Sequence, residues 1–347
     1  MEQSSTLQAF VKLGSFLFNY LAEKNNPDTG TFQDFKEVLL RAKAQNSWFT
    51  PENLKFSIRQ WANMLTENNL NKWLEVYDST SKKKPKTVAI IMAGNIPLVG
   101  FHDFLCVLLS GNRVLAKLSS NDRLLLPFLT EKLIEDVPEL KEYIRFTEEK
   151  LEDFDAVIAT GSNNTSRYFE YYFGKYPNII RKNRNSVTVL SENESEDELR
   201  ALGEDVFRYF GLGCRNVSKL YVPNGYDFDK FYTAIFDFQE VIHQNKYANN
   251  YDYNKAVYLM SNVKILDNGF LILKEDRGFA SPIACLFYEF YEEKSVLRKK
   301  LISEKEKIQC VVSKGWFDDE IPFGQTQDPR LNDYADGVDT MDFLLNL

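Results

Sequence analysis

The run Thr87-Val88-Ala89-Ile90-Ile91-Met92-Ala93-Gly94-Asn95-Ile96-Pro97 joins a short apolar segment to a polar turn. The first six residues are apolar or β-branched, which is typical of a strand buried in a parallel sheet. Gly94 and Asn95 end the strand. Pro97 suits the first turn of a helix, because its missing N–H has no helical partner there. Apolar residues then recur at helical spacing as far as Gly111, where we expect the helix to end.

The same alternation continues along the chain. Further strands are predicted at residues 113–118, 155–160 and 185–190. Ser119–Asp122 and Gly161-Ser162 supply polar starts for the helices between them. Strands alternating with helices at this spacing indicate an α/β fold, a parallel sheet with helices on both faces. Such sheets bind ligands at the carboxyl ends of their strands, where the Gly94-Asn95 and Gly161-Ser162 turns fall.

The pattern divides the chain into four stretches. Residues 1–84 carry apolar residues at helical spacing and are predicted to be mainly helical, with a polar connection at residues 79–86. Residues 85–210 form the first α/β domain. Residues 211–320 continue the alternation as a second, smaller α/β domain, and residues 321–347 form a C-terminal segment.

Composition excludes several classes of protein. No run approaches the roughly 20 apolar residues that span a bilayer, and the first residues do not form a signal peptide, so we expect a cytoplasmic protein. The formal net charge of −8 argues against nonspecific nucleic-acid binding. The four cysteines and two histidines lack the spacing of a metal site, and the cysteines are expected to be reduced thiols.

Five segments occur in an order that resembles the aldehyde dehydrogenase superfamily. They are Gly94-Asn95-Ile96-Pro97, Lys117-Leu118-Ser119, Thr160-Gly161-Ser162, Gly211-Leu212-Gly213-Cys214 and Pro322-Phe323-Gly324. Within the superfamily, residues 85–347 are similar to the acyl-CoA reductase branch, the family of the fatty acid reductase of bacterial luminescence (LuxC). The resemblance implies a dinucleotide-binding domain at residues 85–210, a catalytic domain at residues 211–320, and a C-terminal segment that returns towards the active site.

Cys214 matches the nucleophile of this family. The flanking glycines, Gly211 and Gly213, allow tight turns and close approach of a substrate. A thiolate is a strong nucleophile and a good leaving group, so it can exchange acyl groups with coenzyme A. The alternative is an inert core cysteine. That alternative is the prediction for the three cysteines inside apolar runs, Cys106, Cys285 and Cys310.

The resemblance assigns roles to further residues. The Asn95 side-chain amide and the Cys214 backbone N–H would together form the oxyanion hole, which stabilises the tetrahedral intermediate. The alternative for Asn95 is an ordinary turn residue. Lys117 and Ser119 would contact the cofactor ribose. Here Leu118 and Ser120 replace the proline and glutamate of the family pattern. Without that carboxylate there is no repulsion of a 2′-phosphate, which favours NADPH, with NADH as the alternative. Gly161-Ser162 would present a helix start to the cofactor diphosphate.

Other positions match the family less well. Ser166 replaces a glycine of the family pattern. Glu275 resembles the glutamate that holds the nicotinamide ribose, or is an exposed loop residue. His102 and His243 are candidate proton donors, with a structural histidine as the alternative.

One departure concerns the direction of the reaction. Oxidising relatives carry a water-activating glutamate, whereas the corresponding stretch here, residues 181–186, has none. Its absence favours reduction of a thioester. The basic residues of this stretch are a solvated loop or contact a phosphate.

The resemblance therefore implies an acyl-CoA reductase that forms an aldehyde with NAD(P)H. The alternatives are an acyl-phosphate reductase similar to glutamyl phosphate reductases, and a degenerate member that acts as a binding subunit. The chain is short for the family, with 61 residues from Cys214 to Glu275. The sequence therefore leaves undecided whether the protein forms a homodimer.

Overall fold

The computed structural model describes residues 3–22, 32–77 and 84–347. It forms two compact units, the first made of Met1–Lys182 with Arg330–Leu347 and the second of Asn183–Pro329. These divisions differ from the domain boundaries expected from sequence at residues 84, 210 and 320. The strand predicted at residues 185–190 explains most of the difference, because it pairs within the second unit. Of the polar connection predicted at residues 79–86, residues 79–83 lie outside the described residues.

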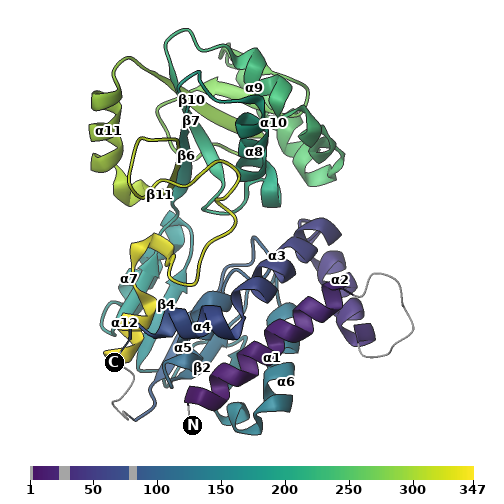
Figure 1. The fold of residues 1–347 in the computed structure, drawn as a ribbon, viewed down its shortest axis with the longest axis vertical. Coiled ribbons are helices and arrows are strands. Elements are labelled where there is room, and N and C mark those ends of the chain that lie inside the picture. Colours follow the sequence, from purple (N-terminus) through teal and green to yellow (C-terminus); the bar gives the residue numbers. More distant parts are fainter. Residues whose placement is uncertain (1–2, 23–31, 78–83) are drawn as a thin grey trace. The chain divides into compact units, whose positions relative to one another are not determined.

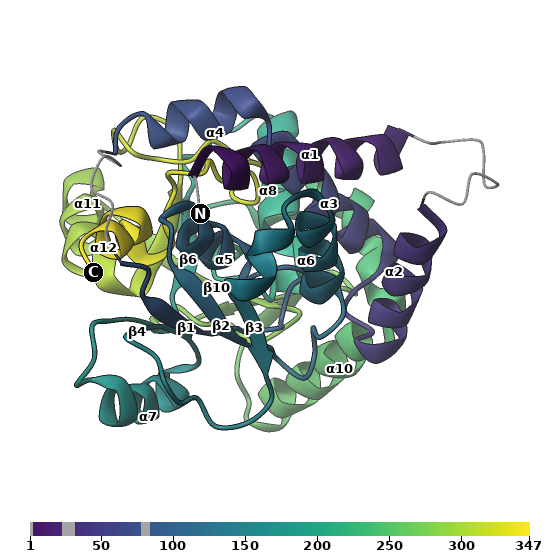
Figure 2. The same cartoon turned by 90° about the horizontal axis from the view of Figure 1, so that it is seen from below.

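The first unit contains a parallel sheet of five strands in the order β3-β2-β1-β4-β5. The strands are β1 (Thr87–Ile91), β2 (Arg113–Lys117), β3 (Ile144–Thr147), β4 (Ala156–Thr160) and β5 (Asn178–Arg181). Successive side chains alternate between the two faces. Val88 and Ile90 pack in the core with α5 (Phe101–Leu109) and α6 (Leu125–Asp136), whereas Ala89 packs on the opposite face with α7 (Asn163–Phe173). Figure 2 shows these helices on opposite sides of the sheet, as predicted.

Four N-terminal helices add a layer over α5 and α6, confirming the helical prediction for the described part of residues 1–84. They are α1 (Gln3–Ala22), α2 (Gln33–Gln45), α3 (Pro51–Met64) and α4 (Glu67–Leu74). Thr50 and Thr66 cap α3 and α4, each accepting a backbone N–H three residues along. The apolar faces of these helices join the core of α5 and α6, so the helical layer and the sheet form one unit.

The second unit contains a sheet of six strands in the order β11-β6-β7-β10-β9-β8. The strands are β6 (Asn185–Val189), β7 (Val217–Pro223), β8 (Ile265–Asp267), β9 (Ile272–Glu275), β10 (Cys285–Tyr291) and β11 (Ile308–Val312). The pairs are parallel except that β8 runs antiparallel to β9. Figure 1 shows α11 on one side of this sheet and α8, α9 and α10 on the other. The helices are α8 (Glu196–Phe207), α9 (Phe228–Ala234), α10 (Asn245–Met260) and α11 (Lys294–Ser303).

The C-terminal segment is shared between the units. Residues up to Pro329 belong to the second unit, whereas residues 330–347 belong to the first, where α12 (Thr340–Leu345) packs on α5. Asn112, which precedes β2, donates to the Leu344 carbonyl at 3.1 Å. Helix α12 therefore lies at the amino ends of the strands, away from the predicted binding edge. The earlier part of the segment, near Gly324, lies close to the Cys214 loop.

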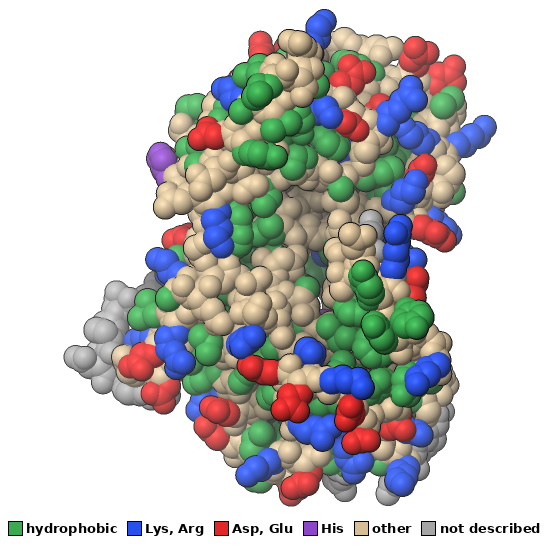
Figure 3. All heavy atoms as spheres, turned by 180° about the vertical axis from the view of Figure 1, so that it is seen from behind, with side chains coloured by type: hydrophobic (Ala, Val, Ile, Leu, Met, Phe, Trp, Pro, Cys, Tyr) green, Lys and Arg blue, Asp and Glu red, His purple; other side chains and the backbone are tan. Residues whose placement is uncertain are grey.

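Acidic and basic side chains are intermixed on the face shown in Figure 3. Among the helices of the described ranges, none has the length and apolar character needed to cross a membrane.

Candidate active site

The candidate residues of the first unit lie at the carboxyl edge of its sheet. The chain passes from β1 outward to β2 and β3, and then returns past β1 to β4 and β5. The strand order therefore reverses between β1 and β4, and the loops after these two strands diverge. Asn95 follows β1, and Gly161 and Ser162 follow β4. The structure thus places both predicted turns where α/β sheets bind ligands.

The loops after β1 and β2 are closely packed. A Cβ atom on Gly94 would lie 2.5 Å from the Ser119 Oγ, so the approach of the two loops requires glycine here. The Asn46 Nδ2 donates to the carbonyls of Gly94 and Asn121, both at 3.4 Å. The buried Asn46 side chain therefore links the two loops, and the structure brings Asn95 and Ser119 to the same edge.

Lys117 is the last residue of β2, at this same edge. Its Nζ donates to the Glu149 carbonyl, after β3, at 2.9 Å. The ammonium group is thereby fixed at the position where doubly wound folds recognise a cofactor ribose. The contact of Lys117 with the cofactor ribose stays a prediction.

The loop after β1 is strained. Leu98 is buried with a φ of 58°, a conformation unusual for leucine. Its N–H donates to the Asp122 Oδ2 at 3.0 Å, and desolvation raises the pKa of Asp122 to about 6. The sequence predicted a helix from Pro97, but α5 begins at Phe101, because Leu98 turns the chain off the helical path. Asp122 supports that turn, and its carboxylate also interacts with the backbone N–H of Leu125, the first residue of α6.

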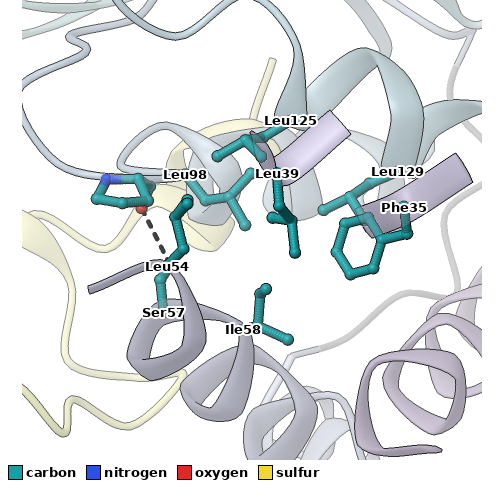
Figure 4. A pocket seen from close by; sticks show the side chains of 9 residues that line it. Phe35, Leu39, Leu54, Ser57, Ile58, Leu98, Leu125 and Leu129 are labelled. Atoms are coloured by element: carbon teal, nitrogen blue, oxygen red, sulfur yellow. Dashed lines mark hydrogen bonds between the residues drawn. The ribbon is translucent and has the colours of Figure 1, made fainter. Parts of the chain in front are cut away.

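The N-terminal helices support the loop from the side of α3. The Ser57 Oγ donates to the Pro97 carbonyl at 3.1 Å. Figure 4 shows this bond beside a small apolar cavity between the loop and three helices. Its lining comprises Phe35, Leu39, Leu54, Ser57, Ile58, Pro97, Leu98, Leu125 and Leu129. The helical layer therefore helps to fix the loop that carries Asn95.

Helix α7 begins at the binding edge, as predicted. The Ser162 side chain caps it by accepting the Thr165 N–H at 3.3 Å. A helix start carries partial positive charge and exposed N–H groups, so it suits an anion such as a diphosphate. Ser166 is buried within this helix. Together with the close approach at Gly94 and the fixed Lys117, these features fit a dinucleotide cofactor.

Cys214 lies in the second unit, between α8 and β7. A strained turn precedes it, because Tyr209, Phe210 and Gly211 have φ values of 53°, 58° and 75°. Only glycine adopts this conformation without strain, and such outliers cluster at functional sites. The Cys214 side chain is exposed. The other three cysteines are buried, as predicted: Cys106, Cys285 and Cys310.

Buried polar side chains hold the Cys214 loop. The Asn216 Oδ1 accepts the Gly213 N–H at 2.8 Å, and its Nδ2 donates to the carbonyls of Asp205 and Arg208 at 3.0 and 2.8 Å. The Ser186 Oγ donates to the Cys214 carbonyl at 3.1 Å. None of these polar residues was predicted from sequence. Asn216 stands close to Cys214 in the chain, but Ser186 carries no local signal because its partner lies 28 residues away.

The predicted Pro322-Phe323-Gly324 turn packs against the same loop. The Arg215 Nε donates to the Thr326 carbonyl at 2.5 Å. The Asp205 carboxylate accepts the Gly324 N–H at 2.6 Å, the Thr326 N–H at 2.9 Å and the Thr326 hydroxyl at 2.8 Å. Residues 322–327 are therefore attached to the Cys214 loop through buried groups.

The Asp205 carboxyl is expected to make stability depend on pH. Desolvation raises its pKa from 3.8 to about 6, outweighing its hydrogen bonds. A raised folded-state pKa stabilises the protein below pH 4, and this contribution is lost as the pH rises through 6. The shift corresponds to about 3 kcal/mol. We predict that Asp205→Asn removes the dependence, so the unfolding free energy of the wild type minus that of the variant falls between pH 4 and 7. Urea denaturation would contradict this if the difference stayed constant.

Glu275 is not brought near Cys214. It ends β9, is exposed, and pairs with Tyr288 of β10, which pairs with Leu220 of β7. Glu275 therefore lies two strand spacings, about 10 Å, from β7. Its register position is that of Leu220, the fourth residue of β7. Cys214 precedes the first residue of β7. The following loop is closer to that end of the strand, since the Ser218 Oγ donates to the Phe279 carbonyl at 2.5 Å.

The two histidines have different environments. His102 is buried in α5, with its Nε2 2.9 Å from the Leu331 carbonyl and its Nδ1 3.8 Å from the Cys106 Sγ. Burial lowers its pKa, so the ring is neutral and bonded within the core. His243 is exposed and lies 2.8 Å from a Glu240 carboxylate oxygen. His102 therefore has the contacts of a structural histidine, the alternative to a proton donor.

The basic stretch at residues 181–186 is divided by the boundary between the units. Arg181 is buried and binds both Asp103 oxygens, at 2.5 and 2.8 Å, and the Thr340 hydroxyl at 3.1 Å. It is therefore not part of a solvated loop. Lys182 is exposed and pairs with Glu170. Ser186, at the other end, contacts the Cys214 loop.

These arrangements agree with the sequence comparisons. The profile of the acyl-CoA reductase (LuxC) family matches residues 24–239, more than half of the chain, including Asn95 and Cys214. The chain belongs to the acyl-CoA reductase (LuxC) family. Comparison with curated protein sequences found no match.

Solved structures show which proteins share the fold of this LuxC family member. An aldehyde dehydrogenase C mutant from Pseudomonas syringae, complexed with NAD+ and octanal, aligns with a TM-score of 0.65 at 10% identity, over 91% of this chain and 73% of that one. The aldehyde dehydrogenase of Mycobacterium tuberculosis complexed with NAD+ aligns with a TM-score of 0.61 at 14% identity, over 90% and 74%. That of Bacillus cereus, an NAD+ complex, gives 0.61 at 11%, over 90% and 72%.

The fold is therefore that of the aldehyde dehydrogenases, as the sequence predicted. Membership of this family indicates an aldehyde-related oxidoreductase.

Proposed function

We propose that this chain is an acyl-CoA reductase that forms an aldehyde through a thioester on Cys214. The observation that carries the proposal is the exposed Cys214 thiol, which follows a strained turn in a chain whose other cysteines are buried. A thiolate both attacks a thioester and leaves from one, so it suits transfer of an acyl group from coenzyme A.

In the proposed reaction, the Cys214 thiolate attacks the acyl carbonyl and forms a new carbon–sulfur bond. The Asn95 amide and the Cys214 N–H stabilise the oxyanion. Collapse of the oxyanion breaks the bond to coenzyme A, whose thiolate leaves and takes a proton.

The second half of the reaction releases the aldehyde. The hydride for the acyl carbon would come from NADPH when that cofactor is bound. Cys214 then leaves as a thiolate, and the carbonyl reforms as the free aldehyde. We assign NADPH binding to the edge with Lys117, Ser119, Gly161 and Ser162, because the Leu118–Ser120 stretch has no carboxylate to repel a 2′-phosphate.

The direction of the reaction is supported by residues 181–186. Buried Arg181 and Ser186 stand at the ends of this stretch, and it contains no carboxylate that could activate water. An acyl thioester then survives until hydride arrives.

Acyl labelling tests the proposal. We expect radioactive acyl-CoA to label Cys214 stoichiometrically, and NADPH to chase the label into aldehyde. NADH in a parallel chase compares the two cofactors. Labelling by an acyl phosphate but not by acyl-CoA would instead favour the activity of glutamyl phosphate reductases. No labelling by either donor would favour a non-catalytic binding subunit.

A further inference from the structure

Asp205 is a buried carboxylate that the proposed reaction does not use. It lies near the end of α8, nine residues before Cys214, and its side chain is fully shielded from solvent. Three donors from one short segment converge on it: the N–H groups of Gly324 and Thr326 and the Thr326 hydroxyl, at 2.6 to 2.9 Å. A buried carboxylate with this many partners fixes the segment that supplies them.

Two chains of hydrogen bonds lead from Asp205 to the residues on either side of Cys214. The first passes through Thr326, whose carbonyl accepts the Arg215 Nε at 2.5 Å. The second passes through Asn216, which donates to the Asp205 carbonyl at 3.0 Å and accepts the Gly213 N–H at 2.8 Å. The first chain begins at the Asp205 carboxylate, whereas the second begins at its backbone carbonyl, so the Asp205 side chain acts on the Arg215 side of Cys214.

The Gly324 turn adds a steric constraint to the first chain. Gly324 has a φ of 80°, and a Cβ atom there would lie 3.0 Å from the Ala201 Cβ on α8. The turn thus packs against α8, the helix that bears Asp205, and the Asp205 carboxylate accepts the Gly324 N–H at this contact. Thr326 and Asn216 are both buried, so water does not replace these bonds easily.

We infer that Asp205 is a positioning residue for the Cys214 nucleophile. This inference rests on the proposed function. The Asp205 carboxylate fixes Thr326, whose carbonyl anchors the Arg215 side chain, and so keeps the loop that carries Cys214 in the geometry needed for acyl transfer. Asp205 does this without touching the substrate.

The inference separates two reactions of the same thiol. Acyl transfer needs the thiol and the oxyanion donors aligned, and a displacement of about 1 Å lowers such rates by about a hundredfold. Alkylation by iodoacetamide needs only an accessible thiolate. Loss of positioning should therefore slow acylation and leave alkylation nearly unchanged.

The experiment compares both rates in the full chain at pH 7. In Asp205→Asn, an amide NH2 group replaces one of the two carboxylate oxygens. A backbone N–H that donated to that oxygen then loses its acceptor. We expect acylation by acyl-CoA to slow by about ten- to a hundredfold, with alkylation within about threefold of wild type. Thr326→Val loses the hydroxyl that donates to Asp205 and accepts from the Gln327 Nε2 at 3.4 Å but keeps the backbone N–H bond, so it should slow acylation by a smaller factor. This second variant carries the test if Asp205→Asn does not fold.

Asp267→Asn is the matched control. Asp267 is a carboxylate in the same unit that accepts bonds from Tyr251, Lys255 and the Gly269 N–H, but it lies on the edge strand β8. Its variant should acylate at the wild-type rate.

Two outcomes would overturn the inference. One is acylation of Asp205→Asn within twofold of wild type. The other is an equal decrease of acylation and alkylation, which a purely structural defect would give. A wild-type protein that takes up no acyl label instead refutes the proposed function itself.

Discussion

Replacement of Cys214 by alanine is expected to lower acyl-CoA reduction by at least about a thousandfold, because no other group can carry the acyl chain. The remaining cysteines are buried and cannot substitute for it. The fold should be retained, since Cys214 is exposed. Aldehyde formation from acyl-CoA with NADPH measures the loss, and absence of acyl label on the variant shows that the covalent step has gone.

Cys310→Ala provides the control for this prediction. Cys310 is a buried thiol of β11, in the same unit, and its replacement removes one sulfur without touching the Cys214 loop. Its variant should keep a reduction rate within a fewfold of wild type. If Cys214→Ala retained more than a few per cent of the wild-type rate, Cys214 would not be the acyl carrier.

Arg181→Ala is expected to destabilise the first unit by about 3–5 kcal/mol, because it leaves the Asp103 carboxylate buried without its counter-ion. Both side chains are almost completely buried and make two hydrogen bonds to each other. The guanidinium also binds Thr340, so the substitution loosens the attachment of α12 to the sheet. Chemical denaturation of wild type and variant at pH 7 measures the change.

Lys182→Ala is the matched control, since the neighbouring residue forms an exposed ion pair with Glu170. Its removal should change the unfolding free energy by no more than about 1 kcal/mol. Replacing the buried pair by apolar residues, as Arg181→Met with Asp103→Leu, should recover most of the lost stability. Equal stabilities of Arg181→Ala and Lys182→Ala would show that the buried pair does not stabilise the unit.

The strands and helix starts nearest to β1 were predictable because their causes are local. The apolar runs at residues 87–92 and 155–160 form central strands. Ser162 caps α7 through an N–H three residues away. Prediction failed at the helix start after Pro97, because the left-handed Leu98 is maintained by Asp122, which is distant in sequence.

The membership of strands in sheets was not predictable. Residues 185–189 have the composition of the strands before them, yet they pair with β7 and β11 in the second sheet. Strand pairing depends on long-range contacts, and a short apolar run contains no information about which sheet will receive it. The boundary between the units therefore fell at residue 182 and not at residue 210.

For Cys214, the sequence by itself determined a reactive-thiol candidate, because the flanking glycines and the apolar runs around the other cysteines are local features. Only the tertiary structure decided which groups hold it. Ser186, Asp205 and Thr326 are ordinary polar residues in sequence, and their partners lie 28 to 121 residues away. A buried polar group must find a hydrogen-bond partner, but the folded chain alone determines which partner is within reach.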